Sequence, residues 1–320
     1  MKTRIKKFLS LTIPLLIGLG IIYYQYTTLS SDELEKIKIS FVKADYFYIY
    51  LSLFIALFGF WSRAYRWKFA LQHLGYNTKF HNDLLTVCVS YLINLTIPRS
   101  GEISRAALLK KYEGVPFDKA FGTIVAERIV DMLIFLLFVA IGFLLQFDTI
   151  YQYLLKNGVQ FETLIGLLVA GFILFILFIL IWIYAEWSII LKLKQKLSGL
   201  IEGMESILKM KDKWKYIFHS FFIWFSYLAM FYITIFALPE TAEISFDIVV
   251  MGFIFGTIAI GFTNGGLGAY PLAVASILSL YGISEGVGTA FGYLIWVSQT
   301  LLTIFLGLLS YLLLPLLNKK

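Results

Sequence analysis

The chain has 320 residues, of which 59% are hydrophobic and 15% are charged, and its formal net charge is +7. Soluble domains carry about 25% charged residues, whereas several apolar runs here reach ~18 residues or more, so the composition excludes an ordinary soluble protein. No long polar stretch interrupts the chain, which predicts a single integral membrane domain over residues 1–320. The single cysteine, Cys88, excludes an intramolecular disulfide and a cysteine-based metal cluster.

In chain order, the apolar runs predict six full crossings, at residues 8–29, 46–66, 120–147, 163–186, 215–238 and 287–316. The first run follows basic residues, but it is too long for a signal peptide and lacks an A-x-A cleavage site, so we interpret it as an uncleaved helix. Residues 188–213 place apolar and basic side chains at helical spacing. This pattern predicts an amphipathic helix on the cytoplasmic surface, with a solvated connecting helix as the alternative.

Two further apolar segments do not fit a plain crossing. Residues 84–97 are short and end at a proline, and residues 245–282 are interrupted by the run GFTNGGLGAYP at 261–271. We predict that 84–111 is a re-entrant hairpin from the cytoplasm and 245–282 one from outside, because this topology leaves most lysines and arginines on the cytoplasmic side. The basic charge then orients the protein on anionic lipid, and nucleic acid is not expected as a partner.

The predicted fold class is therefore an all-α polytopic membrane protein with about six full transmembrane helices and two re-entrant helical hairpins. Both termini are expected on the cytoplasmic side of the cytoplasmic (inner) cell membrane. Opposed hairpins are consistent with an inverted repeat, the plan by which transporters place a site near the midplane of the bilayer.

The tip of the first predicted hairpin carries unusual charge, in the run PRSGEISR. Ser100 is expected to cap a helix that starts near Gly101, and that glycine permits the close approach of a backbone or ligand. Glu102 falls in the first turn, where the helix dipole favours an anion. Since Arg99 and Arg105 flank this positive helix end, the tip is a candidate phosphate site.

Charge also lies inside the following crossing, in the run AERIVD. Glu127 and Asp131 share a helix face, and Arg128 is spaced to pair with Asp131. Asp131 is expected about 18 Å along the helix axis, where an unpaired charge costs at least about 2.5–3.5 kcal/mol. Two interpretations stay open: a closed, charge-balanced network of three arginines and three carboxylates that fastens the hairpin, or a hydrated cavity whose arginines exchange carboxylate partners for a lipid phosphate.

The second hairpin carries no charge. Gly265, Gly266 and Gly268 permit a tight break and close packing, Asn264 supplies donors and an acceptor, and Tyr270 follows the glycines. The break is either the outward half of a translocation path or a packing kink, because a broken helix in a bilayer needs protein or a water-filled cavity beside it.

Two arginines, Arg63 and Arg66, end the second crossing beside Trp61 and Trp67. Arginine and tryptophan together are typical of the membrane interface, so anchoring at headgroup depth is the expected role. The chain contains no HExxH, GxSxG or P-loop motif, and we predict no catalytic residue, metal ligand or cofactor.

Three of these runs, RAYRWKFAL, PRSGEISRAALLKKYEGVPFDKAFGTIVAERIVDMLIFLLF and NGGLG, resemble the lysylphosphatidylglycerol synthase transmembrane region family over roughly residues 8–316. The resemblance implies a flippase-like integral membrane protein that moves a lipid, in a stand-alone form without the aminoacyl-transferase domain. The family's charged signature falls on Gly101, Glu102, Arg105, Glu127, Arg128 and Asp131. The chain departs from the family pattern near its end, where AYP replaces an acidic position and Trp296 and Gln299 occupy the region of a common arginine.

The sequence therefore predicts a translocator of a phospholipid or polyprenyl-phosphate-linked lipid rather than an enzyme. Its expected ligands are anionic phospholipids or polyprenyl phosphate, and the absence of an ATPase motif leaves a gradient, a potential or mass action as the driving force. Two alternatives stay open. One is a non-transporting partner of a lipid or envelope-glycan synthesis enzyme, docked through residues 188–213, and the other is an intramembrane lipid-modifying enzyme that uses its paired carboxylates as acid and base.

Overall fold

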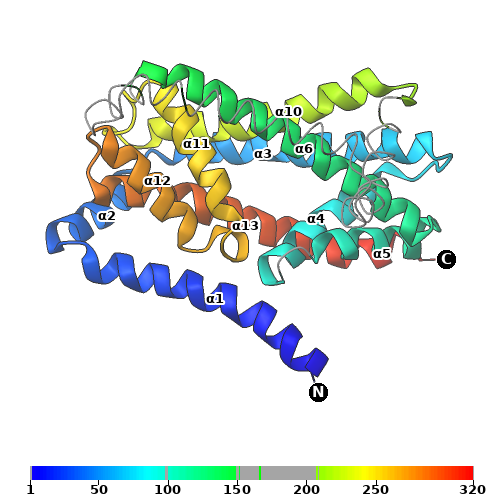
Figure 1. Cartoon of the computed structure of the whole chain (residues 1–320). Helices are drawn as coiled ribbons and strands as arrows, with labels where there is room; N and C mark the ends of the chain where they lie inside the picture. Colours follow the sequence, from blue (N-terminus) through cyan, green and yellow to red (C-terminus); the bar gives the residue numbers. More distant parts are fainter. Residues whose placement is uncertain are drawn as a thin grey trace.

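The computed structural model describes residues 2–97, 100–148 and 209–319, together with the single residues 151, 166 and 207, and it describes side chains from residue 12 onward. In these ranges the chain is helical and contains no strand (Figure 1), which confirms the predicted fold class. The helices are α1 (Lys2–Thr28), α2 (Ser31–Lys43), α3 (Tyr46–His73), α4 (Phe80–Thr96), α5 (Gly101–Glu113), α6 (Phe117–Leu145), α10 (Lys213–Thr234), η1 (Ile235–Ala237), α11 (Phe246–Ile260), η2 (Asn264–Gly266), α12 (Ala269–Leu280) and α13 (Glu285–Leu317).

Within the described residues, four helical segments are long and apolar enough to cross a bilayer: α3, α6, α10 continued through η1, and α13. They coincide with the crossings predicted at 46–66, 120–147, 215–238 and 287–316. Helix α1 has 27 residues and covers the crossing predicted at 8–29. The predicted crossing at 163–186 and nearly all of the amphipathic segment at 188–213 lie outside the described residues.

The first predicted hairpin is formed by α4 and α5. These helices have 17 and 13 residues, or roughly 26 and 20 Å, which is shorter than the ~30 Å hydrocarbon core. The helices pack closely where Gly101 faces the Ser90 carbonyl of α4, so that a Cβ at this position would collide with backbone. Gly101 therefore has the close-packing role that the sequence predicted for it.

The cap of α5 differs from the prediction. Helix α5 begins at Gly101 as expected, but Ser100 has helical φ and ψ angles of −90° and −14° and makes no capping hydrogen bond. Its hydroxyl instead donates to the Ile97 carbonyl over 2.6 Å. The Gly101 N–H donates to the side-chain oxygen of Asn94 over 2.7 Å. The neighbouring helix of the hairpin thus supplies the cap that Ser100 was expected to provide.

The second predicted hairpin is formed by α11 and α12, with the break at η2 between them. Gly265, Gly266 and Gly268 have φ angles of 59°, 84° and 69°, a region that favours glycine. The carbonyl of Gly265 accepts a hydrogen bond from the Trp296 indole of α13 over 2.7 Å. The glycines therefore make the break that their sequence predicted.

The tips of the two hairpins meet in the middle of the molecule, with α4 and α5 toward one end and α11 and α12 toward the other (Figure 1). The Asn264 side chain donates to the Thr96 carbonyl over 3.4 Å. A Cβ at Gly265 would lie 2.7 Å from Leu95 of the first hairpin. The sequence-based expectation of two hairpins that point at each other is consistent with these contacts.

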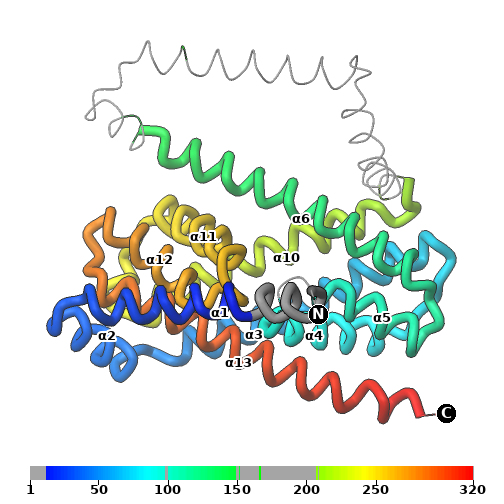
Figure 2. Tube along the Cα trace, turned by 60° about the horizontal axis from the view of Figure 1, so that its bottom comes forward, coloured from blue at the N-terminus to red at the C-terminus, as the bar shows by residue number. Residues whose placement is uncertain are grey.

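Helix α1 passes across the second hairpin on one side (Figure 2). A Cβ at Gly268 would lie 2.6 Å from the Gly18 carbonyl, and a Cβ at Gly18 would lie 2.8 Å from the Leu267 carbonyl. This backbone-to-backbone approach depends on glycine in both segments. The break of the second hairpin is therefore held between α1, α13 and the tip of the first hairpin.

Two large apolar clusters hold the described helices together. One surrounds Trp67 and joins α3, α4, α5 and α6 through residues such as Leu71, Leu109 and Ile124. The other joins α6, α10, α11, α12 and α13 through aromatic residues such as Phe231 and Phe253. The charged side chains described next contact the first cluster, because Arg105 lies over the Trp67 ring and Arg66 over the Tyr216 ring.

Candidate functional site

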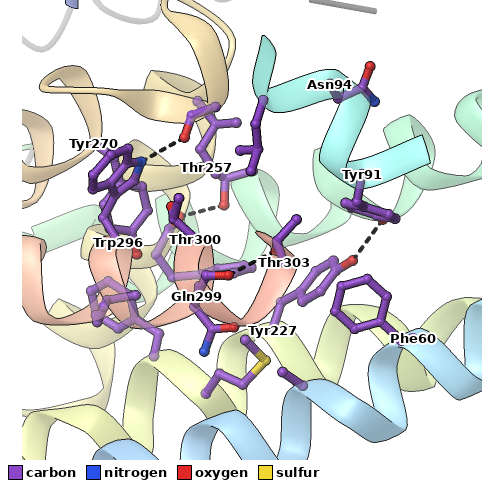
Figure 3. Close-up of a pocket in the computed structure, with 18 of the residues that line it drawn as sticks. Phe60, Tyr91, Asn94, Tyr227, Thr257, Tyr270, Trp296, Gln299, Thr300 and Thr303 are labelled. Carbon is purple, nitrogen blue, oxygen red and sulfur yellow. Dashed lines mark hydrogen bonds between the residues drawn. The ribbon is translucent and has the colours of Figure 1, made fainter. Parts of the chain in front are cut away.

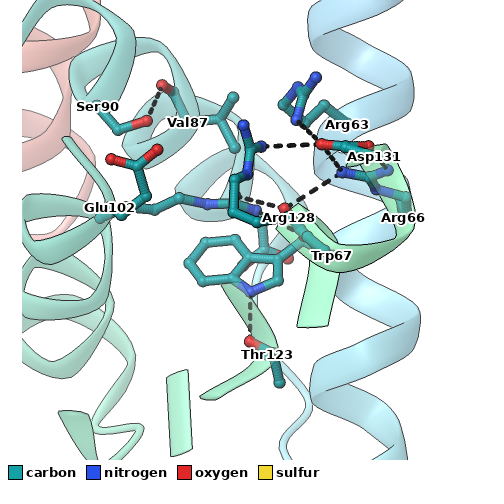
Figure 4. Close-up of polar contacts among 12 residues, drawn as sticks. Arg63, Arg66, Trp67, Val87, Ser90, Glu102, Thr123, Arg128 and Asp131 are labelled. Atoms are coloured by element: carbon teal, nitrogen blue, oxygen red, sulfur yellow. Dashed lines mark hydrogen bonds and ion pairs between the residues drawn. The ribbon is translucent and has the colours of Figure 1, made fainter. Parts of the chain in front are cut away.

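Asp131 of AERIVD faces inward from α6 and meets Arg63 and Arg66 of α3 (Figure 4), and Glu127 of the same run also pairs with Arg66. Glu127 is 0% exposed and Asp131 is 6% exposed. Arg66 places its two terminal nitrogens 2.5 Å from Asp131 Oδ1 and 3.4 Å from Glu127 Oε2. Arg63 lies 3.3 Å from Asp131 Oδ2. The helix-face argument for the two carboxylates is consistent with this arrangement.

The predicted anchoring role of Arg63 and Arg66 is wrong, because both side chains are buried in the protein. They are 3% and 0% exposed, and both face Asp131. Arg63 also donates to the Tyr227 hydroxyl over 2.8 Å, and Arg66 to the Ser220 hydroxyl over 3.2 Å. The two arginines are three residues apart, which places them on one face of α3.

Arg105 connects the first hairpin to this cluster. Its terminal nitrogens donate to the two oxygens of Glu127 over 2.8 and 3.2 Å, a bidentate geometry. Its guanidinium lies 3.6 Å from the centre of the Trp67 ring, and the Trp67 indole donates to Thr123 over 2.8 Å. Glu127 thereby joins α3, α5 and α6, and this inner part of the cluster fastens the hairpin.

Arg128 forms the exposed part of the cluster. It makes the i,i+3 pair with Asp131 that its spacing predicted, with Arg128 Nη2 3.2 Å from Asp131 Oδ2. Its side chain is nevertheless 44% exposed, whereas the other three arginine side chains of the cluster are at most 4% exposed. Arg128 is thus the guanidinium that an incoming anion reaches with the least rearrangement.

The predicted balance of three positive and three negative charges differs from the cluster observed among the described residues. Glu102 makes no ion pair there and accepts a hydrogen bond from Asn94 over 3.4 Å, while Arg99 lies outside the described ranges. Helix α3 instead adds two arginines. Four guanidinium groups therefore contact two carboxylates, an excess of two positive formal charges in surroundings where uncompensated charge is costly.

A cavity of about 470 Å³ adjoins this cluster. Arg63, Arg128 and Asp131 lie on its wall, and Gly265 and Tyr270 line it at the break of the second hairpin. Figure 3 shows Tyr270 beside other uncharged lining residues. Most of the remaining lining is aromatic or aliphatic, with a few neutral polar side chains. The members with a neutral polar group are Tyr91, Asn94, Trp224, Tyr227, Thr257, Trp296, Gln299, Thr300 and Thr303.

The structure divides the predicted site residues that it describes into four groups. Arg105, Glu127, Arg128 and Asp131 form the charged cluster, and Gly265 and Tyr270 line the cavity. Ser100, Gly101 and Glu102 lie in the turn of the first hairpin, while Asn264, Gly266 and Gly268 build the break of the second. Sequence reasoning missed Arg63 and Arg66, although two arginines on one face of an apolar helix were a usable signal of inward-facing charge.

Among the described residues, no group of three histidine, cysteine, aspartate or glutamate side chains is arranged to hold a metal ion. What the cluster offers chemically is a set of guanidinium donors. Arginine donors match the oxygens of phosphate or carboxylate in a planar, bidentate geometry.

Fold and site together define a multi-pass helical membrane protein with a buried ionic cluster beside an internal cavity. Residues 11–307 match the family model described as the lysylphosphatidylglycerol synthase TM region, and the chain belongs to that family. The resemblance based on the charged and glycine-rich runs is thereby confirmed.

A curated relative is the UPF0104 membrane protein MJ1595 of Methanocaldococcus jannaschii, which is 34% identical over 140 residues. The match covers 42% of this chain and 39% of the relative, so the chain spans about two fifths of that protein's length. No solved structure matches the chain.

Proposed function

We propose that this protein is a lipid translocator whose cavity accepts a phosphate-bearing headgroup. The observation that carries the proposal is the excess of arginine over carboxylate beside the cavity, with Arg63 and Arg128 on its wall. A phosphate would supply the missing negative charge and match the guanidinium donors. A lipid-related membrane role also fits the family to which the chain belongs.

The cavity gives the headgroup a polar starting point and an aromatic continuation. It extends from the arginines toward the second hairpin, where the two hairpin tips touch through Asn264 and Thr96. Passage of a headgroup requires these tips to separate, while the lipid tails stay in the bilayer. The proposed substrates are anionic phospholipids or polyprenyl-phosphate lipids, moved across the cytoplasmic membrane with both termini of the protein on the inner side.

The alternative of an acid–base enzyme has weaker support. Asp131 is within 3.3 Å of three arginines, and both oxygens of Glu127 accept hydrogen bonds from Arg105. Both carboxylates are thus engaged by arginine donors, and neither is placed to exchange a proton with a substrate without losing such a partner. The other alternative is a non-transporting partner that docks on a lipid or envelope-glycan synthesis enzyme through residues 188–213. Nearly all of these residues lie outside the described ranges, so this alternative stays a prediction.

The direct test is lipid translocation by the full chain in reconstituted vesicles. We expect the wild-type protein to speed the transfer of a labelled anionic phospholipid between leaflets, and Arg128→Gln to lower the rate at least about tenfold, since it removes a charge-assisted contact. Lys215→Gln is the matched control, because this exposed lysine pairs with Asp212 on the protein surface, outside the cavity lining. Equal rates for wild type and Arg128→Gln would rule out the proposed site.

A further inference from the structure

We infer that the cavity selects lipids with a net anionic headgroup and rejects headgroups that carry an ammonium group, such as a lysyl ester. The inference rests on the proposed function, because it takes the cavity to be the headgroup site. It is unexpected for a chain whose family is described by the synthase of a lysylated lipid. Three observations support it: arginines already pair with both carboxylates, the other described residues of the cavity wall are uncharged, and aromatic rings near the arginines already have partners.

Neither carboxylate of the charged cluster is free to accept an ammonium group. Asp131 Oδ1 lies 2.5 Å from Arg66, and Asp131 Oδ2 lies 3.2 to 3.3 Å from Arg63, Arg66 and Arg128. Glu127 is fully buried, and Arg105 occupies both of its oxygens. An ammonium group would have to displace an arginine from its carboxylate, which leaves that guanidinium uncompensated beside a further cation.

The rest of the cavity wall offers no substitute carboxylate. Apart from Arg63, Arg128 and Asp131, the described residues that line it are uncharged. The second hairpin contributes Gly265 and Tyr270, and α13 contributes Gln299, whose amide lies among the lining side chains (Figure 3). An ammonium group in this cavity therefore meets an excess of positive charge, and like charges brought together disfavour binding.

Two rings of the cavity wall, Trp224 and Tyr91, already have partners and do not offset this repulsion. Ammonium groups can bind over aromatic faces, but only where the ring face is accessible. Trp224 is stacked against Phe135 and Phe138, with ring centroids 5.6 and 6.0 Å apart. The Tyr91 ring already faces Arg63, at 5.5 Å. These rings serve packing and an internal cation, so a headgroup ammonium gains little from them.

Lipid binding to the purified full chain tests the inference. Phosphatidylglycerol, its lysyl ester and a polyprenyl phosphate are compared at equal concentration by native mass spectrometry or by displacement of a fluorescent lipid. We expect phosphatidylglycerol and polyprenyl phosphate each to bind at least about tenfold more tightly than the lysyl ester. Equal or tighter binding of the lysyl ester would overturn the inference, and tighter binding of only one anionic lipid would identify which source of phosphate the site takes.

A substitution in the cavity wall tests directly whether the charge of the wall sets the lipid preference. Gln299→Glu adds a carboxylate to the cavity wall and should shift the preference toward the lysyl ester by about tenfold, whereas Gln299→Met, of similar length but uncharged, should leave it unchanged. An unchanged preference in Gln299→Glu would contradict the claim that wall charge sets selectivity. If vesicles show equal transfer of phosphatidylglycerol and its lysyl ester, the inference fails and the proposed function stands. If no lipid is bound or moved, the proposed function fails as well.

Discussion

The two hairpins meet at their tips, yet they are held in the protein by different forces. The first is joined to the bundle through ions, because Arg105 of α5 binds Glu127 of α6. The second is joined through backbone contacts, as Gly268 approaches the Gly18 carbonyl and Trp296 donates to the Gly265 carbonyl. An ion pair can exchange one partner for another anion, whereas a glycine contact depends on fixed backbone geometry.

This difference assigns separate roles to the two halves of the cavity. The arginine-rich half binds charge, and the glycine-rich half shapes the break and contacts the facing tip. The charged cluster itself is also divided, with Arg66, Arg105 and Glu127 fully enclosed and Arg128 half exposed. Substitutions in the enclosed part should therefore affect stability, and substitutions at Arg128 should affect lipid transfer.

The largest effect on stability is expected for Glu127→Gln. The change leaves Arg66 and Arg105 without their shared carboxylate, and removing one partner of a buried ion pair costs about 3–5 kcal/mol. Thermal unfolding in detergent, followed by circular dichroism, measures the loss. Glu102→Gln is the control on α5, the helix that carries Arg105. No ion pair is broken there among the described residues, and its effect should stay below about 0.5 kcal/mol. Equal effects of the two substitutions would show that the charged cluster does not hold the hairpin.

A smaller loss is expected for Gly268→Ala in the second hairpin. The φ angle of +69° disfavours alanine, and the new Cβ would lie 2.6 Å from the Gly18 carbonyl, so we expect a loss of about 1–3 kcal/mol. Gly20→Ala is the control on α1, because no heavy atom lies within 4 Å of the Cβ it would add. That control should unfold at the wild-type temperature or slightly above it. The same unfolding measurement compares them, and a Gly268→Ala protein as stable as Gly20→Ala would contradict the close approach of α1 to the hairpin.

The smallest effect is expected for Asn264→Ala, which removes the contact between the two tips. The hydrogen bond to Thr96 is long, at 3.4 Å, so its loss should lower stability by less than about 1 kcal/mol. Lipid transfer in vesicles should be retained, because the tips separate more easily without this bond. A loss of transfer as large as that of Arg128→Gln would place Asn264 in the binding site rather than in the break.

The sequence predicted most of the helical architecture, because long apolar runs and breaks at proline and glycine are local signals. It also predicted that Glu127 and Asp131 point inward, since charge exposed to lipid is costly. It misplaced Arg63 and Arg66 because the second crossing was expected to end near residue 66, whereas α3 continues to His73. The seven additional residues move both arginines from the expected interface into the helix interior.

The remaining differences arise from contacts between distant parts of the chain. Ser100 has the residue type of a helix cap, but the Asn94 side chain of the facing helix occupies the Gly101 N–H. The predicted balance of three positive and three negative charges counted only the runs PRSGEISR and AERIVD. It changes because Arg63 and Arg66 of α3 join the cluster. The cap has no local signal, because it depends on which helix packs against α5. The spacing of Arg63 and Arg66 was a local signal of inward-facing charge, but their carboxylate partner on α6 was not.

Lipid mass spectrometry on the gently purified protein tests the account most directly. The wild-type protein should retain a phosphate-bearing anionic lipid well above its abundance in the surrounding membrane, and the double variant Arg63→Gln/Arg128→Gln should lose that enrichment while it remains folded. Retention of the same lipid by the double variant, or no enrichment on the wild-type protein, would contradict the assignment of the arginine-lined cavity as a headgroup site.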